Sequence, residues 1–278
     1  MSRRNFLLAS SLALVGAGTL GVHHVRRNNE ADQLGLERLT LPIQGLHPSL
    51  DGFRIVQLTD IHLSKLVKAP FAQEAVDLAN SLQPDLTVLT GDYVWHGVEA
   101  IFELAPILAG LNARHGVYAV MGNHELWEGV EVVKTALREV GLPYLINQGV
   151  TISQGAGNLY LAGLDDGWSG KPDLDATLVG APADAPVILL LHEPDLADDY
   201  AHYPNMALQL SGHSHGGQIR LPGIGAPILP KLGRKYDMGL YKVGEMWLYT
   251  SRGVGVTNEP IRFNCPPEVT EITLTVGS

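Results

Sequence analysis

Seven potential metal ligands and one further histidine stand in five short blocks of the chain, each directly after an apolar segment. The ligands are carboxylate, amide and imidazole groups, and the blocks are Asp60-Ile61-His62, Gly91-Asp92, Gly122-Asn123-His124-Glu125, Leu191-His192 and Gly212-His213-Ser214-His215. These side chains are neutral or anionic at pH 7, so burying them together without a cation would be costly. The chemistry that they indicate is the binding of divalent metal ions.

The spacing inside the blocks supports this interpretation. Residues i and i+2 of an extended chain point to the same side, so the pair Asp60 and His62, like the pair His213 and His215, can aim at one centre or at two adjacent ones. Mixed nitrogen and oxygen ligands without thiolate favour Mn, Fe, Zn or Co over Mg or Ca alone. Taken singly, each block also fits a capped turn or a core histidine. The five blocks together, each after an apolar strand, favour the metal site.

In the first half of the chain, the elements that must position these blocks repeat the order strand, turn, helix. Apolar runs predict strands over 53–59, 86–90 and 116–121, and helical periodicity predicts helices over 70–82, 99–111 and 130–140. Alternation of strands and helices indicates βαβ units with a parallel sheet. The carboxyl ends of such strands meet at one edge, where sites assemble.

Beyond residue 149 the pattern changes to shorter predicted strands that glycines and prolines separate. They cover 158–162, 187–191, 207–211, 218–221, 245–250 and 270–276. We expect an α/β fold, a four-layer α/β/β/α sandwich in which two mixed sheets pack face to face between helices. No linker of biased composition divides the body, so we expect one domain over 51–278, with residues 28–50 leading into it.

Residues 1–27 have the layout of an export segment. The pair Arg3-Arg4 precedes a moderately apolar stretch, 6–22, which is short for a membrane span and contains three glycines. Paired arginines before Phe-Leu are similar to a twin-arginine signal, which uses the export machinery for folded proteins. We therefore expect an exported protein, periplasmic or on the outer face of the cytoplasmic membrane, with cleavage or retention as an anchor left open.

Charge and cysteine content exclude some classes of protein. The net charge is −10, but the 27 N-terminal residues hold four of the 19 basic residues and no acid. The remainder has 15 basic against 29 acidic residues, a balance of −14, which argues against a broad nucleic-acid-binding surface. A single cysteine, Cys265, excludes an internal disulfide framework.

The order of the five blocks resembles that of the calcineurin-like metallophosphoesterase superfamily, over roughly residues 53–276. Within it, the chain looks most like exported bacterial phosphodiesterases of the twin-arginine type. Three segments carry this closer likeness, namely Gly212-His213-Ser214-His215-Gly216-Gly217-Gln218-Ile219-Arg220-Leu221-Pro222, Ser251-Arg252-Gly253-Val254-Gly255 and Pro260-Ile261-Arg262-Phe263.

The resemblance implies a role for each ligand. It places Asp60, His62 and His215 on a first metal, Asn123, His192 and His213 on a second, and Asp92 between the two. It implies that His124 faces the substrate and protonates the leaving oxygen. It also implies that a water activated by the two metals attacks phosphorus without a covalent enzyme intermediate.

The expected function is hydrolysis of a phosphodiester that is small or derived from a lipid or the cell wall. Where phosphoprotein phosphatases have Asp-Arg, this chain has Trp95-His96, and the missing arginine argues against a phosphoserine or phosphothreonine substrate. Two alternatives are a UDP-2,3-diacylglucosamine pyrophosphatase of lipid A synthesis, whose cytoplasmic reaction disagrees with an export signal, and a non-catalytic metal-binding protein. The second alternative disagrees with the complete ligand set.

Overall fold

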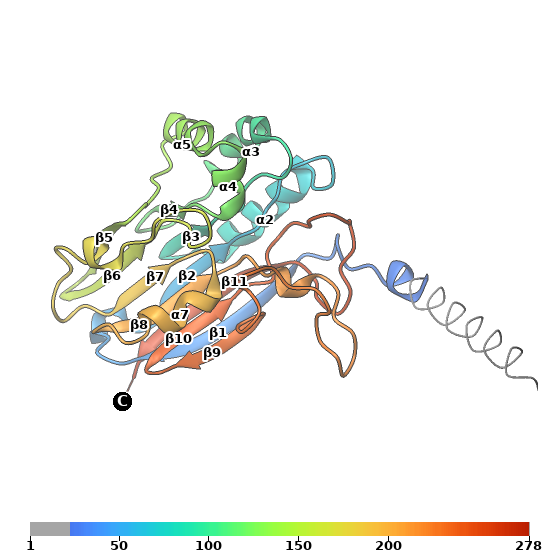
Figure 1. The fold of residues 1–278 in the computed structure, drawn as a ribbon. Helices are drawn as coiled ribbons and strands as arrows, with labels where there is room; N and C mark the ends of the chain where they lie inside the picture. The colour runs from blue at the N-terminus through green and yellow to red at the C-terminus, as the bar shows by residue number, and fades with distance from the viewer. Residues whose placement is uncertain (1–22, 278) are drawn as a thin grey trace, which may run out of the picture.

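Two β-sheets packed face to face form the centre of the protein in the computed structural model, which describes residues 23–277 (Figure 1). The first sheet has the spatial order β1 (Gly35–Ile43), β11 (Glu268–Val276), β2 (Phe53–Leu58), β3 (Leu86–Thr90) and β4 (Val117–Val120). The second has the order β5 (Gln148–Gln154), β6 (Gly157–Gly163), β7 (Val187–Leu190), β8 (Met206–Ser211), β10 (Met246–Thr250) and β9 (Gly239–Val243). Both sheets mix parallel and antiparallel pairs.

Helices cover the outer face of each sheet. On the first sheet lie α2 (Ala69–Ser81), α3 (Ile101–Leu108), α4 (Asn123–Glu128) and α5 (Val130–Glu139), and on the second the one-turn helices α6 (Leu174–Thr177) and α7 (Ala197–Tyr200). Helix α2 shows why these segments pack as they do. It buries Ala72, Ala75, Val76 and Ala79, a spacing that forms one helical stripe against the sheet. The predicted four-layer α/β/β/α sandwich is therefore confirmed.

A separate apolar core lies between the sheets. It joins strand residues of the first sheet, such as Ile55 and Val88, to residues of the second, such as Leu190 and Leu208. The parallel pairs β2–β3 and β3–β4 confirm the predicted βαβ series. This packing brings the carboxyl ends of β2, β3 and β4 toward those of β7 and β8, where the five blocks stand.

Several element predictions need correction. Residues 35–43, within the segment expected only to lead into the domain, form β1, which pairs in parallel with β11 over nine residues. The helix expected over 99–111 is a 3-10 turn, Val98–Ala100, followed by α3, which holds Pro106. Residues 218–221 form only isolated bridges, because the 3-10 turn His215–Gly217 and the tight turn after Leu221 leave no room for a ladder.

The export segment lies mostly outside the described residues, which begin at residue 23. Residues 23–27 are helical, and the chain reaches β1 after a short turn. Within residues 23–277, none of the helices has both the length and the hydropathy needed to span a bilayer.

Candidate metal centre

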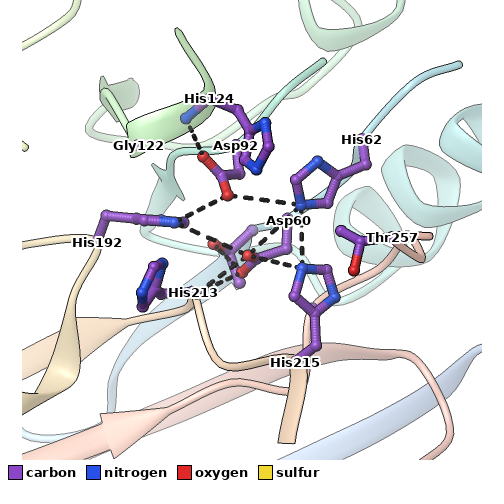
Figure 2. Close-up of polar contacts among 12 residues, drawn as sticks. Asp60, His62, Asp92, Gly122, His124, His192, His213, His215 and Thr257 are labelled. Carbon is purple, nitrogen blue, oxygen red and sulfur yellow. Dashed lines mark hydrogen bonds and ion pairs between the residues drawn. The ribbon is translucent and has the colours of Figure 1, made fainter. Parts of the chain in front are cut away.

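The five blocks converge on one buried point between the carboxyl ends of five strands (Figure 2). Asp60 and His62 follow β2, Asp92 follows β3, and Asn123 begins α4 after β4. From the second sheet, His192 follows β7, whereas His213 and His215 follow β8. All seven predicted ligands are buried.

The ligand atoms form two adjacent clusters. One is Asp60, His62 and His215, and the other is Asp92, His192 and His213, and within each cluster the candidate ligand atoms lie within 4.8 Å of one another. Asp92 lies between the clusters in Figure 2: its Oδ2 is 3.5 Å from His62 Nε2 and 3.1 Å from His192 Nε2. Two adjacent candidate metal sites with a carboxylate near both are the arrangement expected of a dinuclear centre.

For three of the four imidazoles, a backbone carbonyl on the far side of the ring shows which nitrogen is turned toward the centre. Nδ1 of His192 lies 2.7 Å from the carbonyl oxygen of Thr90, and Nδ1 of His62 lies 3.2 Å from that of Val94. A carbonyl only accepts, so each Nδ1 carries a proton and each Nε2 is the nitrogen that faces the centre. For His213 the relation is reversed, because its Nε2 donates to the carbonyl of Lys231 at 2.7 Å and leaves Nδ1 free.

Internal hydrogen bonds, such as the one between His62 Nε2 and His215 Nε2 at 3.0 Å, leave other buried polar atoms of the centre unsatisfied, and metal ions would satisfy them. His192 Nε2 faces the carboxylate Oδ2 of Asp92 at 3.1 Å, and when the ring is neutral neither atom has a proton to give. Oδ1 of Asn123 is buried and without a hydrogen-bond partner. Buried acceptors without donors are unfavourable, and a pair of cations would satisfy all of them. Carbonyl groups that hold the distal ring nitrogens are the usual support of ligating histidines.

The backbone at the centre is strained in a regular way. Five of the seven predicted ligands are non-glycine residues in the left-handed region, with φ of 51° at Asp60, 49° at His62, 57° at Asp92, 71° at His213 and 52° at His215. This conformation is uncommon for residues with a Cβ and clusters at functional sites. It turns each ligand sharply out of its strand and toward the centre.

The electrostatics prepare most of the ligands for binding a cation. Burial lowers the pKa of His62 to about 3 and that of His213 to about 4, so both rings are neutral at pH 7. Burial alone would raise the pKa of Asp60 and Asp92, but neighbouring histidines outweigh it and hold both carboxyls ionised. At His192 burial lowers the pKa, and Asp92 outweighs that effect and raises it. The His192 ring therefore holds a second proton when no metal is present, and a metal ion must displace this proton before the ring can bind the ion.

A family profile described as "Calcineurin-like phosphoesterase" matches residues 53–217, more than half of the chain. The chain belongs to this family. It is 37% identical to the uncharacterized metallophosphoesterase YkuE of Bacillus subtilis, over 99% of this chain and 98% of that protein. It is 31% identical to phosphodiesterase YaeI of Escherichia coli, over 99% of both chains. The family and this relative confirm the prediction of a metal-dependent phosphoester hydrolase.

A solved structure supports the fold of this phosphoesterase. The NAD nucleotidase of Haemophilus influenzae superposes with a TM-score of 0.51 at 13% identity, over 73% of this chain and 45% of that one. At this level of identity the likeness shows a shared fold alone.

The predicted general acid of the phosphoesterase, His124, lies beside the ligands. Its backbone N–H donates to Asp92 Oδ1 at 3.0 Å, and its ring centroid is 5.1 Å from that of His62 and 4.5 Å from that of Trp95. Nδ1 lies 3.3 Å from Glu128 Oε1, so this carboxylate fixes the orientation of the ring. The position fits the predicted role, which stays a prediction.

Several supporting residues escaped the analysis of the sequence. Arg262 is fully buried and donates to the carbonyls of Arg252, Gly253 and Gly255, which holds that loop against Asp60. The carbonyls of Thr90, Val94 and Lys231 were also missed, because any residue type carries a carbonyl. For Arg262 the only available signal was its place in a segment that resembles the family.

Glu125 holds the turns that carry the ligands together, and the sequence assigned it no role. Its carboxylate accepts hydrogen bonds from the backbone N–H groups of Asp92, Tyr93 and Gly122, at 2.7 to 2.8 Å. Burial and the nearby Asp92 raise the pKa of Glu125 to about 8, although the three N–H groups lower it. The side chain thereby joins the turn after β3 to the start of α4.

We expect Glu125→Ala to destabilise the phosphoesterase by more than about 3 kcal/mol, because it leaves three buried donors unsatisfied at about 1–3 kcal/mol each. Urea unfolding measures the loss. The matched control is Glu131→Ala on the exposed surface of α5, which should leave the unfolding midpoint unchanged. If the Glu125→Ala variant unfolds at the same urea concentration as the wild type, the role assigned to Glu125 is wrong.

Proposed function

We propose that this phosphoesterase is a two-metal phosphodiesterase that hydrolyses a P–O bond. The observation that carries the proposal is the pair of adjacent ligand clusters with Asp92 between them. Asp60, His62 and His215 would hold one divalent ion, Asn123, His192 and His213 the other, and Asp92 both, with Mn, Fe, Zn or Co as the candidate metals. Bound metals of this kind polarise the phosphoryl group and lower the pKa of a water molecule that attacks it.

The chain's own residues orient the reaction. Buried carbonyls orient the rings of His62, His192 and His213, so the opposite ring nitrogens face the centre before any ion binds. Glu128 accepts from Nδ1 of His124, so the proton for the leaving oxygen would come from Nε2 of the doubly protonated ring. The tilted contact of Trp95 with His124, at 4.5 Å between centroids, holds the ring from a second side.

A diester suits the site better than a monoester. Trp95 and His96 occupy the position at which phosphoprotein phosphatases have the arginine that clamps a dianion, and Trp95 packs its edge on His62 at 5.3 Å between centroids. A phosphodiester carries one negative charge fewer than a fully ionised monoester, so it has less need of that clamp. An aromatic ring there also tolerates the second ester arm of a diester.

We expect the manganese-loaded protein to hydrolyse bis(aryl) phosphate with a higher kcat/KM than the corresponding aryl phosphate. Initial rates on both esters, with the metal content determined on the same sample, test this. A higher kcat/KM for the monoester would contradict the diesterase assignment while leaving the phosphoesterase family intact.

We also propose that residues 1–27 direct the folded enzyme through the twin-arginine export machinery. Support comes from the Arg3-Arg4 pair and the moderately apolar stretch after it. Replacing Arg3 and Arg4 by lysine should block export, as measured by the share of full-length and processed protein outside the cytoplasm. The matched control, Arg26→Lys with Arg27→Lys, keeps the pair and should be exported normally. Normal export of the Arg3/Arg4 variant would contradict the signal.

A further inference from the structure

The loop 221–232 presents large apolar side chains to solvent. Ile224 and Ile228 are 74% and 80% exposed. A tight turn holds the tip of the loop, since Leu221 N donates to Gly225 O at 2.9 Å and Ile224 N donates to Leu221 O at 3.0 Å. Prolines at 222, 227 and 230 restrict the backbone further. Both isoleucines are thus exposed on one conformationally restricted loop, and exposed apolar side chains that gather in one place mark an interaction site.

The same stretch of chain is basic in a protein that is otherwise acidic. Residues 200–236 contain no Asp or Glu but four cations, whereas the whole chain has a net charge of −10. Arg220 pairs with Asp237 and Lys235 with Asp198. Lys231 and Arg234 are exposed and have no ion-pair partner within residues 23–277. Exposed isoleucines flanked by unpaired cations match the interface of an anionic bilayer.

The position of the loop agrees with this interpretation. At its base, Arg220 N donates to Phe263 O at 2.9 Å, and the ring of His24 lies 5.6 Å from that of Phe263. The described chain thus begins beside the loop, and the moderately apolar stretch 6–22 precedes it in sequence. Figure 1 shows the loop, in orange, projecting on the side where the chain enters.

The loop also borders the metal centre. The carbonyl of Lys231 accepts from Nε2 of His213, and the ammonium of Lys231 lies 5.7 Å from the ring centroid of Trp168, which contacts His213. On the other side, the backbone of Gly217, two residues after His215, lies against Ala226. A surface that receives the loop would therefore lie close to the metal centre.

We propose that loop 221–232 docks the enzyme on an anionic lipid bilayer. Ile224 and Ile228 enter the boundary between headgroups and acyl chains, and Lys231 and Arg234 contact the headgroups. Burial of a full isoleucine side chain favours the bilayer by more than a factor of ten in partitioning. The proposal concerns where the enzyme works and does not depend on which phosphodiester it cleaves.

A single fluorescent label at the loop tests the proposal in the full-length chain. The sole cysteine, Cys265, is buried, so Ile228→Cys provides one accessible thiol for an environment-sensitive dye. With vesicles of phosphatidylcholine and phosphatidylglycerol, we expect a blue shift, brighter emission and loss of access to an aqueous quencher. The matched control is Val179→Cys, 79% exposed beside α6, whose dye should not respond.

Each other outcome has a defined meaning. No shift at position 228, or an equal shift at position 179, overturns the proposal, even if residues 1–22 bind vesicles. An equal blue shift with vesicles of pure phosphatidylcholine overturns the proposal that the loop binds an anionic bilayer. A shift that grows with protein concentration without vesicles identifies a second copy of the chain as the occupant instead. Ile224→Asp added to the labelled chain should abolish the shift. Hydrolysis of soluble bis(aryl) phosphate by the same variants separates failure of docking from failure of the proposed function.

Discussion

Asp92→Asn is expected to abolish the binding of two metals and to lower phosphodiesterase activity by more than about 100-fold. Changes to residues that only support a metal ligand typically cost 10–100-fold, so loss of the carboxylate between both clusters should cost more. The amide keeps the size of the side chain, and its oxygen can still accept from His124 N, as Asp92 Oδ1 does at 3.0 Å. Its NH₂ group would then point toward the free nitrogen of His192 and donate to it.

This geometry separates loss of metal from loss of fold. The metal-free variant should keep the fold of the metal-free wild type, because the amide fills the same space and can donate a hydrogen bond to the neutral His192 ring. Only the wild type should gain thermal stability when Mn²⁺ is added. The matched control is Asp85→Asn, a buried carboxylate away from the centre that pairs with Arg114 and should keep its metals. Wild-type turnover by Asp92→Asn would exclude the bridging role.

His124→Ala is expected to keep both metals but to slow turnover by about 10²–10⁴-fold, the usual contribution of a general acid. The loss should be largest for alkyl leaving groups, which depart poorly without a proton, and smallest for nitrophenolate. Steady-state rates across a series of leaving groups measure this, with metal content determined on each sample. The mutation removes the ring that lies between His62 and Trp127 but no predicted ligand atom.

His96→Ala is the matched control for this experiment. His96 is exposed, contacts Trp95 at 4.5 Å between ring centroids, and lies in the same loop region. It should leave turnover unchanged for every leaving group. Equal slowing of all substrates by His124→Ala, or loss of a metal ion, would assign His124 a structural role in place of proton transfer.

The buried strands and the ligand blocks were predictable together, because each apolar run marks a strand and the polar turn at its end holds the ligands. Strands such as β3 are apolar on both faces and end in Gly91-Asp92, where the chain must turn sharply. Three of the four edge strands carry no such signal, whereas the apolar β4 does. β5 and β9 lie at the ends of the second sheet and are only partly buried, so no continuous apolar run marks them. β1, another edge strand, was missed within a polar segment for the same reason.

The support of the centre was not predictable, because it depends on tertiary packing. Helix α4 begins at Asn123, and a block identified by its ligands did not indicate that Glu125 would turn back to accept three backbone N–H groups. The carbonyl of Lys231 reaches His213 only through the loop that precedes it. Likewise, His192 faces Asp92 only because the second sheet packs on the first. Sequence specifies these ligands, whereas their relative placement depends on the interface between the sheets.

The most direct test of the central claim is a titration of metal-stripped protein with Mn²⁺, in which bound metal per chain and the rate of bis(aryl) phosphate hydrolysis are measured together. The two ligand clusters predict no hydrolysis without metal and a rate that rises until two ions are bound per chain. A centre that holds two ions and cleaves neither diester nor monoester would contradict the account. Saturation of binding and rate at one ion per chain would do so as well.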